Sequence, residues 1–213
     1  MPMTEDEVTL GVVIPTLDQT RLLLELLNSL ETRHPHRLFL IDNAVLGLSV
    51  AASWNRGIEA AFRWGADMAL VINDDVLLHP CTVDRLVQRL QAKPCGLICA
   101  YDIRNVGLDA TGLANYPVPN PGIDEGVQDF CCFLLPHQTW SRVGPFDETF
   151  TRAYYEDIDY EYRLKQHGLW LGRTTGAPCY HFGSQTGSRH AKPEDWDRNR
   201  EYFRRKWGVV PGG

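Results

Sequence analysis

The stretch Met68-Ala69-Leu70-Val71-Ile72, followed by Asn73-Asp74-Asp75, decides how this sequence folds. Five apolar residues in a row predict a short buried strand, and the three polar residues after them mark its end. In open parallel sheets, ligands bind outside the carboxyl ends of the strands. The stretch therefore predicts both a buried strand and a place for a ligand.

Two further apolar runs, Leu10–Ile14 and Leu38–Ile41, precede this strand and are separated by segments with helical periodicity. We expect a helix capped by Thr20 between them, and a helix from Ser49 to Arg63 after the second run. Strand and helix thus alternate three times. This order predicts an α/β fold with a mostly parallel central sheet flanked by helices.

The second half of the chain is less regular. Residues 102–129 are rich in Gly, Pro, Asn and Asp, which predicts loop with few regular elements. Strands are expected at Gly96–Tyr101 and Phe130–Leu135, and helices at Thr82–Leu90, at Tyr155–Gln166 and from Pro193 onward.

Composition excludes several classes of protein. Of the 213 residues, 44% are hydrophobic and 23% are charged, which argues against a disordered chain, a collagen-like fibre or a coiled coil. The net charge of −6 argues against a global basic surface for duplex nucleic acid. None of the six cysteines forms a C-x-x-C pair, so we expect buried reduced thiols rather than a zinc ribbon.

The start of the chain and its hydropathy bear on location. Residues 1–8 are acidic and polar, unlike a signal peptide, and no apolar stretch approaches the roughly 18 residues of a membrane span. We expect a cytoplasmic protein with no integral membrane segment. The sequence does not predict its oligomeric state.

All three early strands end in polar or turn-forming residues, namely Pro15-Thr16, Asp42-Asn43 and Asn73-Asp74-Asp75. These residues should converge on one edge of the sheet. Neighbouring carboxylates repel one another unless a cation or a donor compensates them, and Mg²⁺ or Mn²⁺ beside a diphosphate is a natural partner. A solvated turn is the alternative for the Asp-Asp pair taken alone.

Two further features come later in the chain. The acidic run Glu156-Asp157-Ile158-Asp159-Tyr160-Glu161 opens a predicted helix. Its carboxylates either suit the helix dipole or include a general base whose pKa nearby rings raise. His181 lies between aromatic residues at an expected strand end, as either a structural residue or a ligand.

In this order, the segments resemble the nucleotide-diphospho-sugar transferases of the GT-A fold, and specifically the compact bacterial and phage members of glycosyltransferase family 2. The resemblance covers roughly residues 9–187. It is carried by seven segments: Val12-Val13-Ile14-Pro15-Thr16, Ile41-Asp42-Asn43, Ser53-Trp54-Asn55-Arg56-Gly57-Ile58, Val71-Ile72-Asn73-Asp74-Asp75-Val76, Val143-Gly144-Pro145-Phe146-Asp147-Glu148, Tyr155-Glu156-Asp157-Ile158-Asp159-Tyr160 and His181-Phe182-Gly183-Ser184.

The resemblance implies a role for each matching residue. Asp42 would accept a hydrogen bond from the base of the nucleotide, which is uracil in many relatives. Asp75 matches the last carboxylate of the family's D-x-D motif, which binds the divalent metal, and His181 matches a histidine that completes the metal site in some relatives. Asp157 of the Glu156-Asp157 pair would be the general base. The remaining residues implied to bind the nucleotide sugar are Pro15, Thr16, Asn55, Arg56, Asn73 and Asp74.

The resemblance also implies a function. We expect one GT-A domain over residues 1–213, with a nucleotide-sugar half at about 8–101, an acceptor and catalytic half at about 102–192, and a C-terminal helix at 193–213. It would be a metal-dependent (Mn²⁺ or Mg²⁺) inverting glycosyltransferase that moves a sugar from a nucleotide-diphosphate sugar, with a UDP-sugar favoured, to an acceptor hydroxyl. The acceptor stays open between a glycan, a lipid-linked sugar and a modified base in nucleic acid.

Two other functions stay open. A sugar nucleotidyltransferase would carry a Gly-rich phosphate loop where this chain has Ile14–Gln19, without glycine. A binding module that has lost catalysis would have no reason to keep Asp75, Asp157 and His181 together. We also expect 183–192 to form a lid over the phosphates, and the basic residues of the last helix to be either a solvated face or a contact for nucleic acid or membrane.

Overall fold

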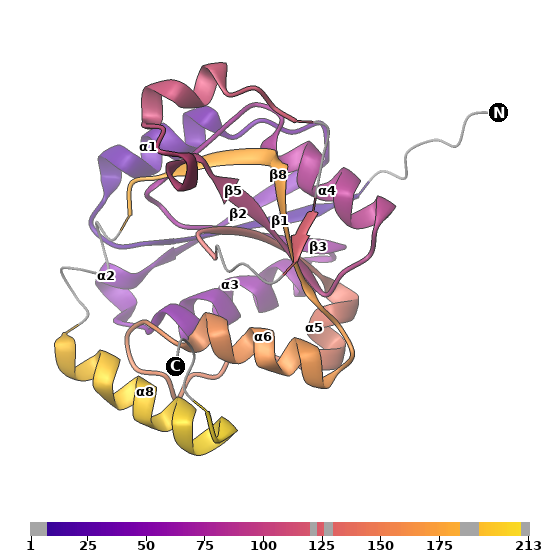
Figure 1. Ribbon diagram of the computed structural model, residues 1–213. Coiled ribbons are helices and arrows are strands. Elements are labelled where there is room, and N and C mark those ends of the chain that lie inside the picture. Colours follow the sequence, from indigo (N-terminus) through magenta and orange to yellow (C-terminus); the bar gives the residue numbers. More distant parts are fainter. Residues whose placement is uncertain (1–7, 120–122, 126–129, 184–191, 210–213) are drawn as a thin grey trace.

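The computed structural model describes residues 8–119, 123–125, 130–183 and 192–209. At its centre is a sheet of eight strands (Figure 1). Seven of them lie in the order β2-β1-β3-β7-β5-β8-β4, and the eighth, β6, pairs with β8. The strands are β1 Leu10–Thr16, β2 His36–Asp42, β3 Met68–Ile72, β4 Val76–Leu78, β5 Leu97–Asp102, β6 Ile123–Glu125, β7 Cys132–Pro136 and β8 Leu171–His181.

Helices cover both faces of this sheet. Alternate residues of the strands point to opposite faces, so that Val12 packs with α1 and α4 while Val13 packs with α3, α5 and α6. Figure 1 shows these layers above and below the sheet. The helices are α1 Thr20–Ser29, α2 Asn43–Leu46, α3 Val50–Trp64, α4 Thr82–Ala92, α5 His137–Val143, α6 Glu156–Gln166 and α8 Pro193–Trp207, with 3₁₀ turns η1 Ile103–Val106 and η2 Ala110–Asn115.

The predicted, mostly parallel sheet is confirmed, and it also contains antiparallel strands. Strand β1 pairs in parallel with β2 and β3, and β5 pairs in parallel with β8. Strand β7 lies between β3 and β5 and is antiparallel to both, so β3 and β5 run the same way. Strands β4 and β6 pair antiparallel with β8. The sequence predicted β7 as a strand, at Phe130–Leu135, but not its direction, because an apolar run contains no information about direction. It did not predict β4 and β6.

Some local predictions need correction. Thr20 is the first residue of α1 rather than its cap, since Gln19 is the N-cap and makes no side-chain capping bond. Ser49 does cap α3, with Oγ 3.2 Å from the backbone nitrogen of Ala52. Residues 102–129, expected as loop, contain η1, η2 and β6. The side chains of Asp102 and Asp109 cap η1 and η2, so these polar residues favour short helical turns there.

Two glycines let α3 approach the sheet closely. A Cβ at Gly57 would lie 2.1 Å from Cγ1 of Val13, and one at Gly11 would lie 2.2 Å from Cβ of Ala61. Both positions therefore exclude larger side chains unless the backbone moves. Gly57 belongs to the Ser53–Ile58 segment, so part of that motif serves packing between α3 and β1.

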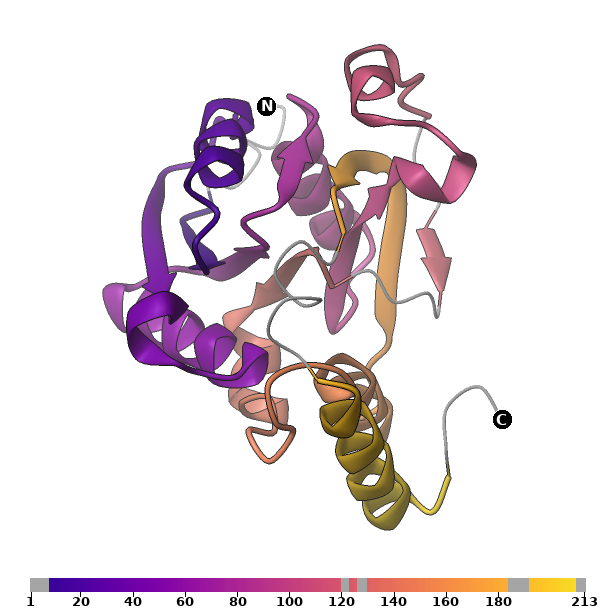
Figure 2. The ribbon, with the colours of Figure 1, turned by 90° about the vertical axis from the view of Figure 1, so that its left-hand side faces the viewer.

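The C-terminal helix α8 packs against α6 and the segment before it (Figure 2). Phe203 is fully buried there and contacts the rings of Tyr155 and Tyr162. All six cysteines are free thiols, and five of them are buried, as expected. Among the described helices, none combines the length and the apolar character needed to cross a membrane.

Candidate functional site

The carboxyl ends of β1, β2 and β3 lie side by side, as the sequence predicts. Thr16 at the end of β1 is opposite Asp42 at the end of β2. The buried carboxylate of Asp74 accepts a hydrogen bond from the backbone of Leu17, with 2.9 Å between Oδ2 and N. This bond ties the loop after β3 to the loop after β1. The polar residues at the strand ends thus form one edge of the molecule.

Asp75 and His181 form the closest pair of candidate metal ligands at this edge. Strand β8 brings the histidine there, because His181 is opposite Val76 in the β4–β8 ladder. Its Nε2 lies 3.1 Å from Oδ1 of Asp75, whose exposed fraction is only 3%. The structure therefore brings together the two residues that the sequence analysis assigned to a metal.

A divalent cation fits this donor set. Two adjacent ligands, each about 2.1 Å from one ion, lie about 3 Å apart, which matches the separation in the pair. Within the described residues, no group of three or more candidate ligands occurs. An ion held by Asp75 and His181 needs further oxygens from water and from a bound diphosphate, which is how Mg²⁺ is often held beside substrate phosphates.

Arg104 completes this cluster and was missed by the sequence analysis. Its Nη2 lies 3.1 Å from Nδ1 of His181, and its guanidinium forms an ion pair of 2.6 Å with the buried Asp102. Asp102 ends β5 and also accepts a hydrogen bond from the backbone nitrogen of Arg104. The only sequence signal was an Asp-x-Arg pattern directly after a predicted strand, within a segment interpreted as loop.

The His181 ring lies between an anion and a cation. Burial lowers the pKa of His181, but hydrogen bonds with Asp75 and Cys131 outweigh burial and raise the pKa to about 10. Arg104 acts in the opposite direction, because a guanidinium can only donate and so favours a ring whose Nδ1 accepts. The carboxylate of Asp75 can thus be balanced either by the proton on His181 or by a metal ion.

The acidic pair lies at the start of α6. Glu156 is 6% exposed, and within the described residues its Oε2 has no hydrogen-bond partner. Burial and the neighbouring charge of Asp157 raise the pKa of Glu156 well above its usual range. Burial also raises the pKa of Asp157, which is the more exposed of the two. A raised pKa suits a carboxyl group that exchanges protons with a substrate.

The backbone that leads into this pair is strained. Arg152, Tyr154 and Tyr155 have φ values of 58°, 83° and 74°, in the left-handed region that favours glycine. Such strain is concentrated at functional sites and persists only where the surrounding structure enforces it. The strained segment also touches the start of α3, where the backbone nitrogen of Val50 donates to the carbonyl of Arg152 over 2.7 Å. This contact links the acidic pair to the side of the molecule where β2 ends.

The side chain of Asn199 in α8 holds much of this strained segment in place. Its side chain is 1% exposed and donates to the carbonyls of Thr151, Ala153 and Tyr154, at 2.9, 2.9 and 3.1 Å. Its Oδ1 accepts from the backbone nitrogen of Thr151 at 3.0 Å. One buried amide thus fixes four backbone groups of the strained segment.

We expect Asn199→Ala to lower the free energy of unfolding by about 3 kcal/mol, because buried backbone groups left without partners cost about 1–3 kcal/mol each. Urea unfolding of the variant, beside Arg200→Ala on the exposed face of the same helix, measures this loss. Equal stability of the two variants would contradict the role of Asn199.

Three residues predicted to bind the nucleotide sugar have other partners or positions. Asn55 is buried and forms hydrogen bonds with the backbone of Phe146 and with Glu148, at 2.8–2.9 Å. These bonds give Asn55 a role in packing α3 against the segment that contains Phe146 and Glu148, and its predicted role toward the nucleotide sugar stays a prediction. Oδ1 of the exposed Asp42 caps α2. Arg56 is exposed on α3.

The basic residues of α8 are mostly paired. Lys206 reaches inward to Asp147 at 2.6 Å and to the buried Asp159 at 2.7 Å. Arg204 pairs with Glu201 on its own helix, at 2.7 Å. These contacts favour a structural surface over one that binds nucleic acid. Most of the predicted lid, including Arg189 and His190, lies outside the described residues.

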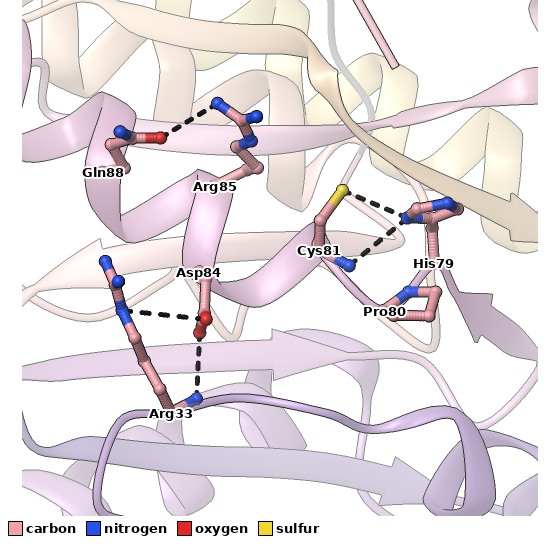
Figure 3. A pocket seen from close by; sticks show the side chains of 7 residues that line it. All are labelled: Arg33, His79, Pro80, Cys81, Asp84, Arg85 and Gln88. Atoms are coloured by element: carbon pink, nitrogen blue, oxygen red, sulfur yellow. Dashed lines mark hydrogen bonds and ion pairs between the residues drawn. The ribbon is translucent and has the colours of Figure 1, made fainter. Parts of the chain in front are cut away.

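A pocket of about 470 Å³ opens beside α4 and is lined by Arg33, His79, Pro80, Cys81, Asp84, Arg85 and Gln88 (Figure 3). Sγ of Cys81 lies 3.1 Å from Nδ1 of His79. Burial raises the pKa of the Cys81 thiol and lowers the pKa of His79, so both groups are neutral near pH 7. This pair therefore lacks the thiolate of a nucleophilic cysteine. No residue assigned above to the candidate site lines the pocket.

The sheet order and its helical layers define a GT-A-like, Rossmann-like fold. The chain is similar to the crystal structure of GalNAc-T7 with UDP, GalNAc and Mn²⁺, with a TM-score of 0.65 and 11% sequence identity. The match covers 93% of this chain and 48% of that chain, so this chain spans about half the length of that protein. No protein-family model and no curated protein sequence matches the chain.

Proposed function

We propose that this protein is a glycosyltransferase similar to family 2, which transfers a sugar from a nucleoside-diphosphate sugar to an acceptor hydroxyl with inversion at the anomeric carbon. UDP-sugars are the favoured donors, and Mn²⁺ or Mg²⁺ is the cofactor. The observation that carries the proposal is the contact between the buried Asp75 and the half-buried His181 at this edge of the sheet. The GT-A-like fold and the neighbour's UDP and Mn²⁺ support the class of donor and the metal, while inversion comes from the resemblance to family 2.

Each residue then has a defined task. Thr16, Asp42 and Asn73 line the donor pocket, while Asp74 shapes its floor through Leu17. Asp75 and His181 would hold the cation, which supplies positive charge to the departing diphosphate. Pro15 belongs to the same strand end.

The acidic pair would perform the proton transfer. Asp157 accepts the proton of the acceptor hydroxyl as that oxygen attacks the anomeric carbon, and the bond from this carbon to the diphosphate oxygen breaks on the opposite side. Glu156 is the more buried of the two, and burial together with the charge of Asp157 raises its pKa well above its usual range. As a protonated group, Glu156 would orient the acceptor by a hydrogen bond.

Thermal unfolding with nucleoside diphosphates tests the proposal. UDP with Mn²⁺ at about 100 times its dissociation constant should stabilise the fold by about 2.7 kcal/mol. ADP, GDP and CDP measured alongside identify the base, and EDTA measures the contribution of the metal. A folded sample that shifts with none of these ligands would contradict the proposal and favour a lapsed binding module.

In this proposal, the acceptor binds to the half of the chain after residue 101. A glycan or a lipid-linked sugar is favoured over a modified nucleic acid base, because Lys206 and Arg204 are already paired with carboxylates.

The pH dependence of transfer follows from the base. Asp157 must be deprotonated to act, and burial raises its pKa above the ordinary value of about 3.9. The rate should therefore rise with pH through this raised pKa and fall on acidification earlier than an exposed carboxyl group would require. A profile of kcat/KM from pH 4 to 8 measures the acid limb. A limb at the ordinary aspartate value would contradict the assignment.

A further inference from the structure

Arg104 lies at the candidate metal site and has no task in the reaction described above. Its side chain is 39% exposed, while its partner Asp102 is 3% exposed. The guanidinium is therefore held by a buried carboxylate, while the side chain as a whole is partly accessible to solvent.

The surroundings of Arg104 fix its direction. Its Nη2 lies 3.1 Å from Nδ1 of His181, and the other nitrogen of the same ring lies 3.1 Å from Asp75. A Cβ built on Gly183 would lie 2.2 Å from Nη1 of Arg104, so the guanidinium lies against the backbone of Gly183. Contacts with Asp102 at the end of β5 and with His181 at the end of β8 thus hold the positive charge beside the candidate metal ligands.

The charge balance of the site calls for such a cation. Asp74, Asp75 and Asp102 are each 3% exposed, and all are placed by backbone or ionic contacts at the same edge of the sheet. A diphosphate that entered this edge would add about two negative charges and would be repelled by unbalanced carboxylates. A guanidinium offers paired donors that match phosphate oxygens.

We propose that Arg104 binds the diphosphate of the donor directly, as a second cation beside the metal at Asp75 and His181. This inference rests on the proposed function and adds a residue that no sequence resemblance assigned. Arg104 then has two effects: it strengthens donor binding, and it stabilises the negative charge that develops on the departing diphosphate.

Binding of UDP and uridine by the full chain tests this role. Arg104→Gln should weaken UDP binding about 10- to 100-fold, the loss expected when one charged hydrogen-bond donor is removed. The loss should occur both with Mn²⁺ and with EDTA, since the guanidinium acts independently of the metal. Uridine carries no phosphate, so its binding, followed by ligand-observed NMR, should not change.

Two variants serve as references. Arg85→Gln removes a half-buried arginine on α4 that pairs with Gln88 and lies outside the candidate site, and it should bind UDP like the wild type. Arg104→Lys keeps the charge beside Asp102 but loses the fork of donors, so its UDP binding should be intermediate. This variant keeps the test informative even where Arg104→Gln does not fold.

The outcomes separate the two proposals. Wild-type binding of UDP that neither Arg104 variant weakens would overturn the role of Arg104 alone. Equal weakening of UDP and uridine would also overturn it, because it would indicate a purely structural role. Wild-type protein that binds no nucleoside diphosphate would overturn the proposed function and this inference with it.

Discussion

Asp157→Asn should abolish sugar transfer while leaving donor binding nearly intact. The amide keeps the size and most of the hydrogen bonds of the carboxylate but cannot accept the proton of the acceptor. General-base catalysis contributes about 10²- to 10⁴-fold, and we expect a loss of this size in kcat. Nucleotide release from the donor, measured once an acceptor is found, gives the rate, and thermal shift with UDP and Mn²⁺ gives binding.

Asp197→Asn is the matched control for this variant, because Asp197 is an exposed aspartate on α8 and should tolerate the same change. The anomeric configuration of the product, read by NMR, is a second check. A product with the donor's configuration, or an Asp157→Asn enzyme with full activity, would show that Asp157 is not the base of an inverting reaction.

Asp75→Asn should remove the metal-dependent part of donor binding. The variant replaces the buried carboxylate next to His181 by a neutral amide, so a divalent cation loses its charged ligand. We expect the extra stabilisation by UDP in Mn²⁺, relative to EDTA, to disappear. Transfer should fall about 10²- to 10³-fold, as when one preorganised electrostatic partner of the transition state is removed.

Asp74→Asn separates metal binding from loop shape. Asp74 accepts a hydrogen bond from Leu17, and the amide oxygen of asparagine can accept the same bond. This variant should therefore keep its response to Mn²⁺. If the two variants lost the response equally, the acidity of the whole segment, rather than Asp75 itself, would hold the ion.

Much of the donor side could be predicted from the sequence. Apolar runs closed by polar residues located β1, β2 and β3, and the alternation with helices made them parallel neighbours. The meeting of Asp42, Thr16 and Asp74 at one edge follows from that topology alone. The pairing of Asp75 with His181 required β8 to run beside β4, which no local pattern indicates.

The contacts that the sequence did not predict also have physical reasons. Asn55 forms hydrogen bonds with residues about 90 positions later, which spacing does not reveal. Arg104 was missed because turn-forming residues dominate its segment, although Asp102 caps a helical turn there. Residue composition predicts that a segment is irregular, but it does not predict which charged side chain that segment places at the site.

The attachment of α8 has a consequence for biosynthesis. A growing chain emerges from its amino end, so the sheet with Asp75 and His181 can assemble before residues 193–207 are available. The segment from Thr151 to Tyr155 stays without the side chain of Asn199 until that helix is made. In a nascent protein, the edge that would receive the donor can therefore form before the segment that leads into the acidic pair is held in place.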